Sequence, residues 1–314
     1  MQPRNNTAGG ACGYQDNGAT AGYQHFFTIM RWYIDHKRHT GSSPAFAQQL
    51  EKAMRHLIIY SGDNIATSQV DVAYCAGFID YLRSATTPTG TILSPMTQAA
   101  YFRCLNCTLN WAVKRGYIPL NPIMRMEADM KPRTPESTRE FLTQGEIHRL
   151  MAAPCRSSHI KRAYLFACFC GLRYSDIKAL TWDNVFMDGR RTRLRIIMRK
   201  TRKTLYLPLS GQALRWMPGR PSRVVPSAPV FHLPSIGYVN IVLKRWARDS
   251  GILKTITFHT SRHTFATLCL QADVNIYTVS KLLGHTQVKT TQIYAKVIDR
   301  QKDEAVDALG RMFV

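Results

Sequence analysis

The stretch Met126–Glu140, MEADMKPRTPESTRE, interrupts the apolar periodicity of the chain and is rich in proline and charge. Such a composition is typical of an exposed linker between domains. A chain of 314 residues is also longer than a single hydrophobic core usually accommodates. We therefore predict a flexible leader over residues 1–22, a first domain over 23–125, a linker over 126–140 and a second domain over 141–314.

The first domain is predicted to be an all-helical bundle. Four segments carry apolar residues at helical spacing: Tyr23–His39, Ser42–Gly62, Ser68–Ser84 and Ser94–Gly116. Two of them open on Ser-Pro pairs and close on glycine, which are start and stop signals of helices. Basic residues that we expect on exposed faces are Arg31, Lys37, Arg38, Lys52, Arg55, Arg103, Lys114 and Arg115. Each alone reads as a solvated charge, and together they could line DNA.

The second domain combines helices with a β-rich stretch. The runs Thr181–Met187, Arg193–Arg199 and Thr204–Leu209 are separated by DGRR and KTRK, which predicts a small antiparallel sheet with tight turns. Helical patterns precede and follow it. The expected fold class is therefore mainly α with a small antiparallel sheet, in which a helical domain precedes an α+β domain.

The charge balance indicates the kind of partner. The formal net charge is +22 and the pI is about 10.0, which suits a dense polyanion such as nucleic acid better than a merely basic soluble protein. The sequence contains no run of about 18 apolar residues, the length that a membrane-spanning helix needs. The N-terminus is polar where a signal peptide would be apolar. We expect a cytoplasmic, nucleoid-associated protein without a membrane partner.

The eight cysteines mostly lie among apolar residues and are expected to be reduced core residues. Cys104 and Cys107 have a zinc-like spacing, but no second Cys/His pair stands at a matching distance. Neither a metal nor another cofactor is expected.

Polar side chains interrupt the apolar pattern of the second domain at two places. Arg173 lies two residues after Gly171, at the junction of two helices, where a surface arginine would be the ordinary interpretation. His259 and Arg262 lie three residues apart and so share a helical face. Arg262 lies on the apolar side of its helix, which costs free energy unless an anion meets it. A buried carboxylate partner would be the structural alternative.

Further along the chain, His285 follows Gly284 at the end of a helix, and Tyr294 comes nine residues later. Taken alone, His285 would be interpreted as a capping or packing histidine, and Tyr294 as a half-buried aromatic residue. Together with the arginines and a lysine-bearing hairpin they suggest attack on a phosphodiester. Arginine forks grip nonbridging oxygens, a cationic pocket favours the phenolate, and a lysine can protonate the leaving oxygen without a metal.

The motifs GLRYSDI, HTSRHTFAT, LLGHT and TTQIYAKV, in this order, resemble those of the tyrosine recombinases, which include phage integrases and XerC/XerD-type resolvases. The resemblance covers nearly the whole chain. It implies a SAM-like core-binding domain and a catalytic domain. It also implies a two-domain recombinase that cuts DNA through a 3′-phosphotyrosine.

Carried over by residue, the resemblance implies that Arg173 and Arg262 hold the scissile phosphate and that Tyr294 attacks it. His285 would donate a hydrogen bond to the phosphate, and His259 would assist proton transfer with the tyrosine. Lys200 would be the general acid, although Lys203 in the same turn stays an alternative. Asp176 would support the first arginine, and a helix N-terminal carboxylate is an equally good reading of it.

The resemblance further implies a homo-tetramer on paired DNA sites and accessory DNA-bending or directionality proteins. The tail Val297–Phe313 would pack on its own domain or on a neighbouring subunit. Two other functions stay open: a type IB topoisomerase with the same chemistry, and a non-catalytic DNA-binding protein of this fold. Neither residue pattern nor resemblance chooses among integration, excision, inversion and dimer resolution.

Overall fold

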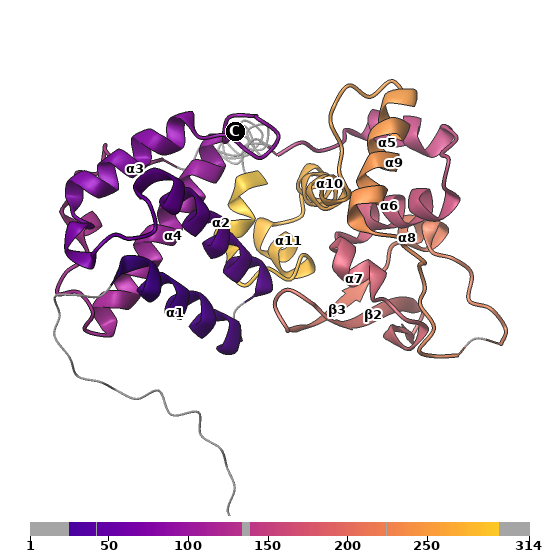
Figure 1. Ribbon diagram of the computed structural model, residues 1–314. Helices are drawn as coiled ribbons and strands as arrows, with labels where there is room; N and C mark the ends of the chain where they lie inside the picture. The colour runs from indigo at the N-terminus through magenta and orange to yellow at the C-terminus, as the bar shows by residue number, and fades with distance from the viewer. Residues whose placement is uncertain (1–24, 42, 134–138, 224, 295–314) are drawn as a thin grey trace, which may run out of the picture. The chain divides into compact units, whose positions relative to one another are not determined.

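A computed structural model describes residues 25–41, 43–133, 139–223 and 225–294. The predicted leader and the tail Val297–Phe313 lie outside the described residues. The chain divides into two compact units, residues 1–137 and 138–314, which are described separately below (Figure 1). The fold class is confirmed: the structure is mostly helical and has a three-stranded antiparallel sheet.

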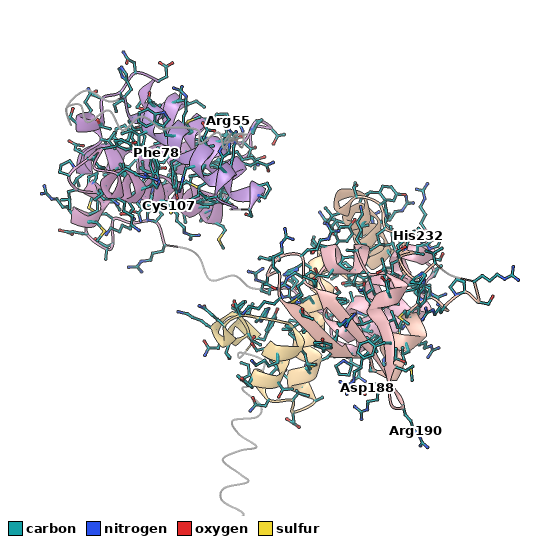
Figure 2. All side chains as sticks on the ribbon, turned by 90° about the horizontal axis from the view of Figure 1, so that it is seen from below. Arg55, Phe78, Cys107, Asp188, Arg190 and His232 are labelled. Atoms are coloured by element: carbon teal, nitrogen blue, oxygen red, sulfur yellow. The ribbon has the colours of Figure 1, made fainter. Side chains whose placement is uncertain are left out.

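The first unit is a helical bundle built from α1 (Phe26–His39), α2 (Pro44–Ser61), α3 (Val72–Ser84) and α4 (Pro95–Lys114). Helix α4 packs against the other three. Short 3-10 turns, η1 (Thr67–Gln69) and η2 (Pro122–Arg125), precede α3 and follow α4. The core combines aliphatic and aromatic side chains, among them Phe78 (Figure 2). Of the eight basic residues predicted to be exposed, Lys37 is half-buried and the other seven are exposed.

The start of α3 differs from its prediction. The helical pattern predicts a helix from Ser68, but α3 begins at Val72. Asp71 is its N-cap, and the carboxylate accepts a hydrogen bond from the Tyr74 N–H at 2.8 Å. This cap fixes the helix start because it satisfies a backbone donor that the first turn leaves free.

The second unit begins with three helices and the sheet. These are α5 (Gln144–Ala152), α6 (Ser158–Cys170), α7 (Tyr174–Lys178), the 3-10 turn η3 (Trp182–Asn184), β1 (Val185–Asp188), β2 (Arg191–Ile197) and β3 (Thr204–Pro208). The strand order is β1-β2-β3, with Leu194 opposite Leu207 on the buried face. Arg190 projects from the turn between β1 and β2 (Figure 2). The predicted antiparallel hairpins are therefore confirmed.

The first predicted strand is shorter than expected. Residues Trp182–Asn184 form a 3-10 turn, and β1 begins only at Val185. The reason is local: the backbone N–H and the hydroxyl of Thr181 both donate to Asn184 Oδ1, at 3.0 and 2.9 Å. Such side-chain bonds offer the backbone an alternative to a strand.

The chain then continues through α8 (Gly211–Trp216), α9 (Ile236–Asp249), α10 (Phe258–Gln271), α11 (Ile276–Leu282) and η4 (Val288–Thr290). Helix α10 packs against α6 and α9 and also contacts α11 (Figure 1). Its central position matters for the site because α10 carries two of the predicted functional residues, His259 and Arg262.

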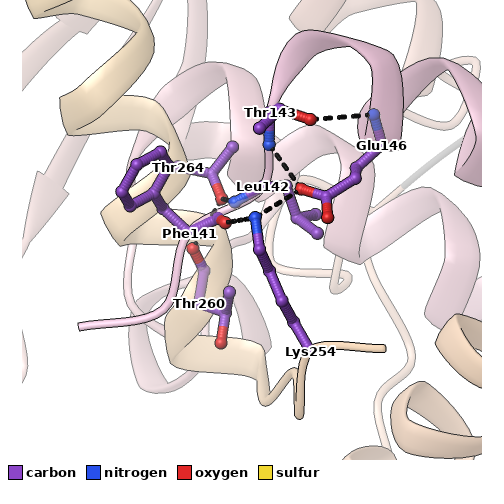
Figure 3. Close-up of polar contacts among 7 residues, drawn as sticks. All are labelled: Phe141, Leu142, Thr143, Glu146, Lys254, Thr260 and Thr264. Carbon is purple, nitrogen blue, oxygen red and sulfur yellow. Dashed lines mark hydrogen bonds and ion pairs between the residues drawn. The ribbon is translucent and has the colours of Figure 1, made fainter. Parts of the chain in front are cut away.

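A polar network fastens the start of the second unit to α10 (Figure 3). Lys254 Nζ donates to the Phe141 carbonyl at 3.0 Å and to Glu146 Oε2 at 2.7 Å. The Leu142 N–H donates to the Thr264 hydroxyl on α10 at 2.9 Å. Thr143 and Glu146 form the capping box of α5 that their spacing predicts. The backbone of residues 141–143 is thus held in place from two sides.

We expect this network to make stability depend on pH. Burial raises the pKa of the Glu146 carboxyl, but the hydrogen bonds from Lys254 and Thr143 outweigh burial, so the net pKa is lowered from about 4.5. A lowered folded-state pKa stabilises the fold above the unfolded pKa, and this contribution is lost as pH falls through the folded value. The free energy of urea unfolding, measured from pH 6 to pH 3, should therefore fall more steeply for wild type than for Glu146→Gln. Parallel curves would contradict the prediction.

Candidate active site

Arg173 is fixed by the junction between α6 and α7. Gly171 ends α6 in the left-handed conformation at φ 68°, and a Cβ there would overlap the Phe265 ring on α10. Arg173 is the N-cap residue of α7, where its guanidinium lies 3.8 Å from Met198 Sδ and 4.0 Å from Asp176 Oδ2. The sequence therefore needs glycine before this arginine, because the chain must turn tightly against α10.

Arg262 lies in the interior, 2% exposed. One guanidinium nitrogen donates to the Gly171 carbonyl at 2.7 Å and another donates to the Leu283 carbonyl at 2.6 Å. These partners are helix-end carbonyls rather than the buried carboxylate of the structural alternative. Desolvation, followed by the neighbouring Arg173, lowers the Arg262 pKa to about 9, so the side chain stays cationic at neutral pH. The charge of Asp176 acts on Arg262, but within the described part of the chain no carboxylate forms an ion pair with it, so this buried cation is suited to receive an anion.

His285 lies just past the end of α11. Gly284 has φ 62°, and the His285 N–H donates to the Ser280 carbonyl at 3.0 Å. Its Nδ1 lies 2.8 Å from the buried hydroxyl of Thr291. Burial and then the charges of Arg262 and Arg173 lower the pKa of His285 to about 4, so the imidazole is neutral at neutral pH.

Gly284→Ala should destabilise the second unit and displace His285. An added Cβ would overlap Met198, and the φ of 62° is strained for any residue with a side chain. We expect a loss of more than about 1 kcal/mol in the free energy of unfolding. Gly219→Ala is the matched control, because a Cβ at Gly219 meets no atom within 4 Å. Equal urea midpoints for the two variants would show the prediction wrong.

Tyr294 is buried, 4% exposed, and packs in a small apolar cluster with Ala266, Leu270, Val279 and Leu283. Its hydroxyl lies 2.6 Å from Nδ1 of His263. Burial raises the pKa of the phenol. The charges of Arg262, Arg139 and Arg173 act in the opposite direction. The hydroxyl thus lies within the electric field of both predicted phosphate-binding arginines.

His263 is a residue that the motif analysis did not single out. The structure places its ring, 6% exposed, between Tyr294 and His259. The His259 and His263 ring centroids lie 4.6 Å apart, edge to face. The spacing of four residues on one helical face could have signalled this pair. His259 itself is exposed, and its pKa is lowered to about 4 by desolvation and then by Arg262.

Lys200 is exposed in the turn between β2 and β3. Its charge contributes to the lowered pKa values of both His259 and His285, which places it on the same side of the domain as the histidines. Asp176 ties this turn to α7, since its Oδ1 accepts a hydrogen bond from the Arg199 N–H at 2.9 Å. The carboxylate is therefore a bridge between the Arg173 junction and the lysine-bearing turn. The functional roles of these residues remain predictions.

Arg139 is a second residue that sequence reasoning missed. It falls in the range predicted to be a linker, and its side chain is exposed. Its positive charge nevertheless acts on the pKa values of His259, His263 and Tyr294. The reason is the anchored backbone of residues 141–142, which lies against α10. No sequence signal could have placed it there, because the approach depends on tertiary contacts.

Metal binding has no evident site in the described part of the chain, where no three His, Cys, Asp or Glu residues form a metal-binding group. Cys104 is buried in the first unit, and burial raises the pKa of its thiol to about 12, which disfavours the thiolate that zinc requires. Among the described residues, no helix is both long and apolar enough to cross a membrane.

Sequence comparisons identify relatives of both units. Residues 25–128 match the phage integrase SAM-like domain, and residues 140–301 match the phage integrase family. A tyrosine recombinase of Thermosipho africanus (strain TCF52B) is 29% identical over 290 residues, which are 88% of this chain and 96% of the relative. Tyrosine recombinase XerC of Neisseria meningitidis serogroup B is 32% identical over 221 residues, which are 62% of this chain and 68% of XerC.

Solved structures share the fold at low sequence identity. The Tn1549 transposon integrase in complex with a circular intermediate DNA has a TM-score of 0.69 and 16% identity, over 86% of this chain and 94% of that chain. A lambda integrase tetramer bound to a Holliday junction has a TM-score of 0.65 and 17% identity, over 88% of this chain and 78% of that chain. The chain therefore belongs to the phage integrase family of tyrosine recombinases.

Proposed function

We propose that this protein is a site-specific recombinase that cleaves and rejoins strands of double-stranded DNA, with Tyr294 as the nucleophile. The observation that carries the proposal is the positive electrostatic potential that two arginines create at the Tyr294 hydroxyl. The charges of Arg262 and Arg173 oppose the rise that burial causes in the pKa of Tyr294. Among the described residues, Arg262 donates to two backbone carbonyls and to no carboxylate. A phosphodiester is the anion that such a pair of guanidinium groups would hold.

The chemical step follows from these roles. The Tyr294 oxygen attacks the phosphorus, the bond from phosphorus to the 5′-oxygen breaks, and the protein is left on the 3′-phosphate. Arg173 and Arg262 stabilise the negative charge that builds on the nonbridging oxygens. Lys200 supplies the proton for the departing 5′-oxygen. Rejoining is the reverse, with a 5′-hydroxyl of the partner strand as the attacking group, so the bond energy is conserved without a further co-substrate.

His285 would contribute a hydrogen bond to the same phosphate. If the Thr291 hydroxyl donates to Nδ1 of the neutral ring, the proton of the imidazole resides on Nε2. That N–H is then available to a nonbridging oxygen. Asp176 would hold the Arg173 junction and the Lys200 turn in register through its bond to Arg199.

The proposal also covers the assembly on DNA and the location of the protein in the cell. The basic first unit would bind the duplex together with the second unit, and four copies would act on paired sites, with accessory DNA-bending or directionality proteins. The lambda integrase tetramer on a Holliday junction is the precedent for such an assembly. We further propose association with the nucleoid, which the net charge of +22 favours.

The test is a denaturing gel of protein mixed with DNA that carries its site. A recombinase should leave polypeptide covalently joined to a strand and should yield recombinant products from two sites on separate molecules. Relaxed circles without recombinants would instead indicate a topoisomerase. Absence of any adduct, under conditions where a protein–DNA complex is seen on a native gel, would indicate a non-catalytic DNA-binding protein.

A further inference from the structure

The hydroxyl of Tyr294 has a buried imidazole as its hydrogen-bond partner. His263 Nδ1 lies 2.6 Å from this oxygen, and both residues are almost inaccessible to solvent. Arg262, the adjacent residue of α10, is already engaged with two backbone carbonyls. The phenol is therefore held by a neutral ring nitrogen rather than by a cation.

The protonation state of this ring makes it an acceptor. Burial is the largest cause that lowers the pKa of His263 to about 3, so the ring carries one proton at neutral pH. A phenol with a raised pKa also keeps its proton. The short bond is then best made by the tyrosine donating to Nδ1, with the ring proton on Nε2.

His259 continues the path toward solvent. It lies one helical turn before His263, and its ring meets that of His263 edge to face at 4.6 Å. Unlike His263, it is exposed. The phenol, the buried imidazole and the exposed imidazole thus form a series that ends at water.

We propose that His263 positions the Tyr294 hydroxyl and accepts its proton during strand cleavage, with His259 exchanging that proton with solvent. As the bond between the tyrosine oxygen and phosphorus forms, the O–H bond breaks and its proton moves to Nδ1. In rejoining, the bond between the tyrosine oxygen and phosphorus breaks, and a proton returns from Nδ1 to the departing phenolate. The inference deepens the proposed function and rests on it.

Binding of DNA would make His263 a better base. The charged and titratable groups that lower its pKa, after burial, are His259, Arg139, Arg262 and His285. A phosphodiester held by Arg262 adds negative charge beside the two arginines, Arg139 and Arg262, and so offsets their effect on the His263 pKa. The imidazole would then gain basicity only when substrate is in place, which keeps the phenol protonated in the free protein.

The experiment separates the nucleophile side of the reaction from the leaving-group side. The variant His263→Asn keeps a hydrogen-bonding group but cannot take a proton. The substrate is duplex DNA with the scissile 5′-oxygen replaced by sulfur, since a thiolate leaves without a general acid. Lys200→Ala and Lys203→Ala are the matched controls, because loss of the general acid should be restored by sulfur. The rate of single-turnover adduct formation is measured for each protein on this sulfur substrate and on the same duplex with the ordinary 5′-oxygen.

We expect His263→Asn to form adduct about 100-fold more slowly or worse on both substrates, the size of a lost general base. DNA binding on native gels should stay near wild type. Of Lys200→Ala and Lys203→Ala, the variant that removes the general acid should form adduct slowly on the oxygen substrate and rapidly on the sulfur substrate. Recovery of His263→Asn by sulfur, or a rate close to wild type on oxygen, would overturn the inference.

If His263→Asn fails to bind DNA, a folding defect could explain its slow cleavage. His263→Gln then takes its place, and its rates of adduct formation on both substrates decide the inference. The proposed function fails in a different way. If the wild type makes no adduct on either substrate, Tyr294 is not the nucleophile, and this inference falls with it. A wild-type adduct together with unimpaired His263 variants removes only the role of His263.

Discussion

Tyr294→Phe is expected to abolish covalent attachment of the protein to DNA while leaving DNA binding almost unchanged. The substitution removes only the hydroxyl, and the ring keeps its contacts with Ala266, Leu270 and Val279. Loss of the bond leaves Nδ1 of the buried His263 unpaired, which costs about 1–3 kcal/mol of stability but does not remove the DNA-binding surface. The nucleophile is gone, however, and no rearrangement of a phenyl ring can replace it. Adduct on a denaturing gel and complex on a native gel measure the two effects.

The matched control is Tyr277→Phe on α11, where the tyrosine is 56% exposed. This variant also loses one phenol hydroxyl from the same part of the domain, but it should retain full cleavage. Adduct formation by Tyr294→Phe at the wild-type rate would assign the chemistry to another residue. Loss of DNA binding in the same variant would mean that the effect is structural.

The helical pattern and turn signals predicted the fold well because they are local properties of the chain. Helices α2 and α4 begin at the Ser-Pro pairs, and the β1–β2 hairpin turns at the DGRR stretch. Boundaries were less accurate where a side chain caps the backbone. Asp71 delays α3, and Asn184 turns the residues after Thr181 into a 3-10 helix. These bonds depend on geometry that periodicity does not encode.

The residues of the candidate site also fall into two groups: those that a local sequence signal could identify and those that only tertiary packing brings to the site. His285 directly follows Gly284 and Arg173 lies two residues after Gly171, and both glycines have positive φ, so a local backbone rule singles these positions out. Arg262 was detectable because a charge on the apolar side of a helix is costly. His263 and Arg139 were not, because each acquires its neighbours only through tertiary packing. For His263 that neighbour is Tyr294, 31 residues along the chain.

Arg262→Ala is expected to slow strand cleavage by about a thousandfold or more, the range seen when an arginine that stabilises a phosphoryl transition state is removed. DNA binding should fall only slightly, because one buried cation contributes little to a complex that the exposed basic residues dominate. Arg248→Ala on α9 removes the same formal charge from a side chain that is 79% exposed, and it should cleave normally. Single-turnover adduct formation and native-gel binding provide the comparison.

Arg262→Lys tests whether charge alone is sufficient. A lysine keeps a cation, but its ammonium is a point charge and cannot reproduce a planar fork that spans the Gly171 and Leu283 carbonyls. Its pKa would also fall further on burial, since a buried ammonium loses its proton readily. We expect cleavage between that of the alanine variant and wild type, with the deficit growing as pH rises. Wild-type cleavage by Arg262→Ala would mean that the guanidinium serves only to join two helix ends, and the thermal stability of that variant would then record its whole effect.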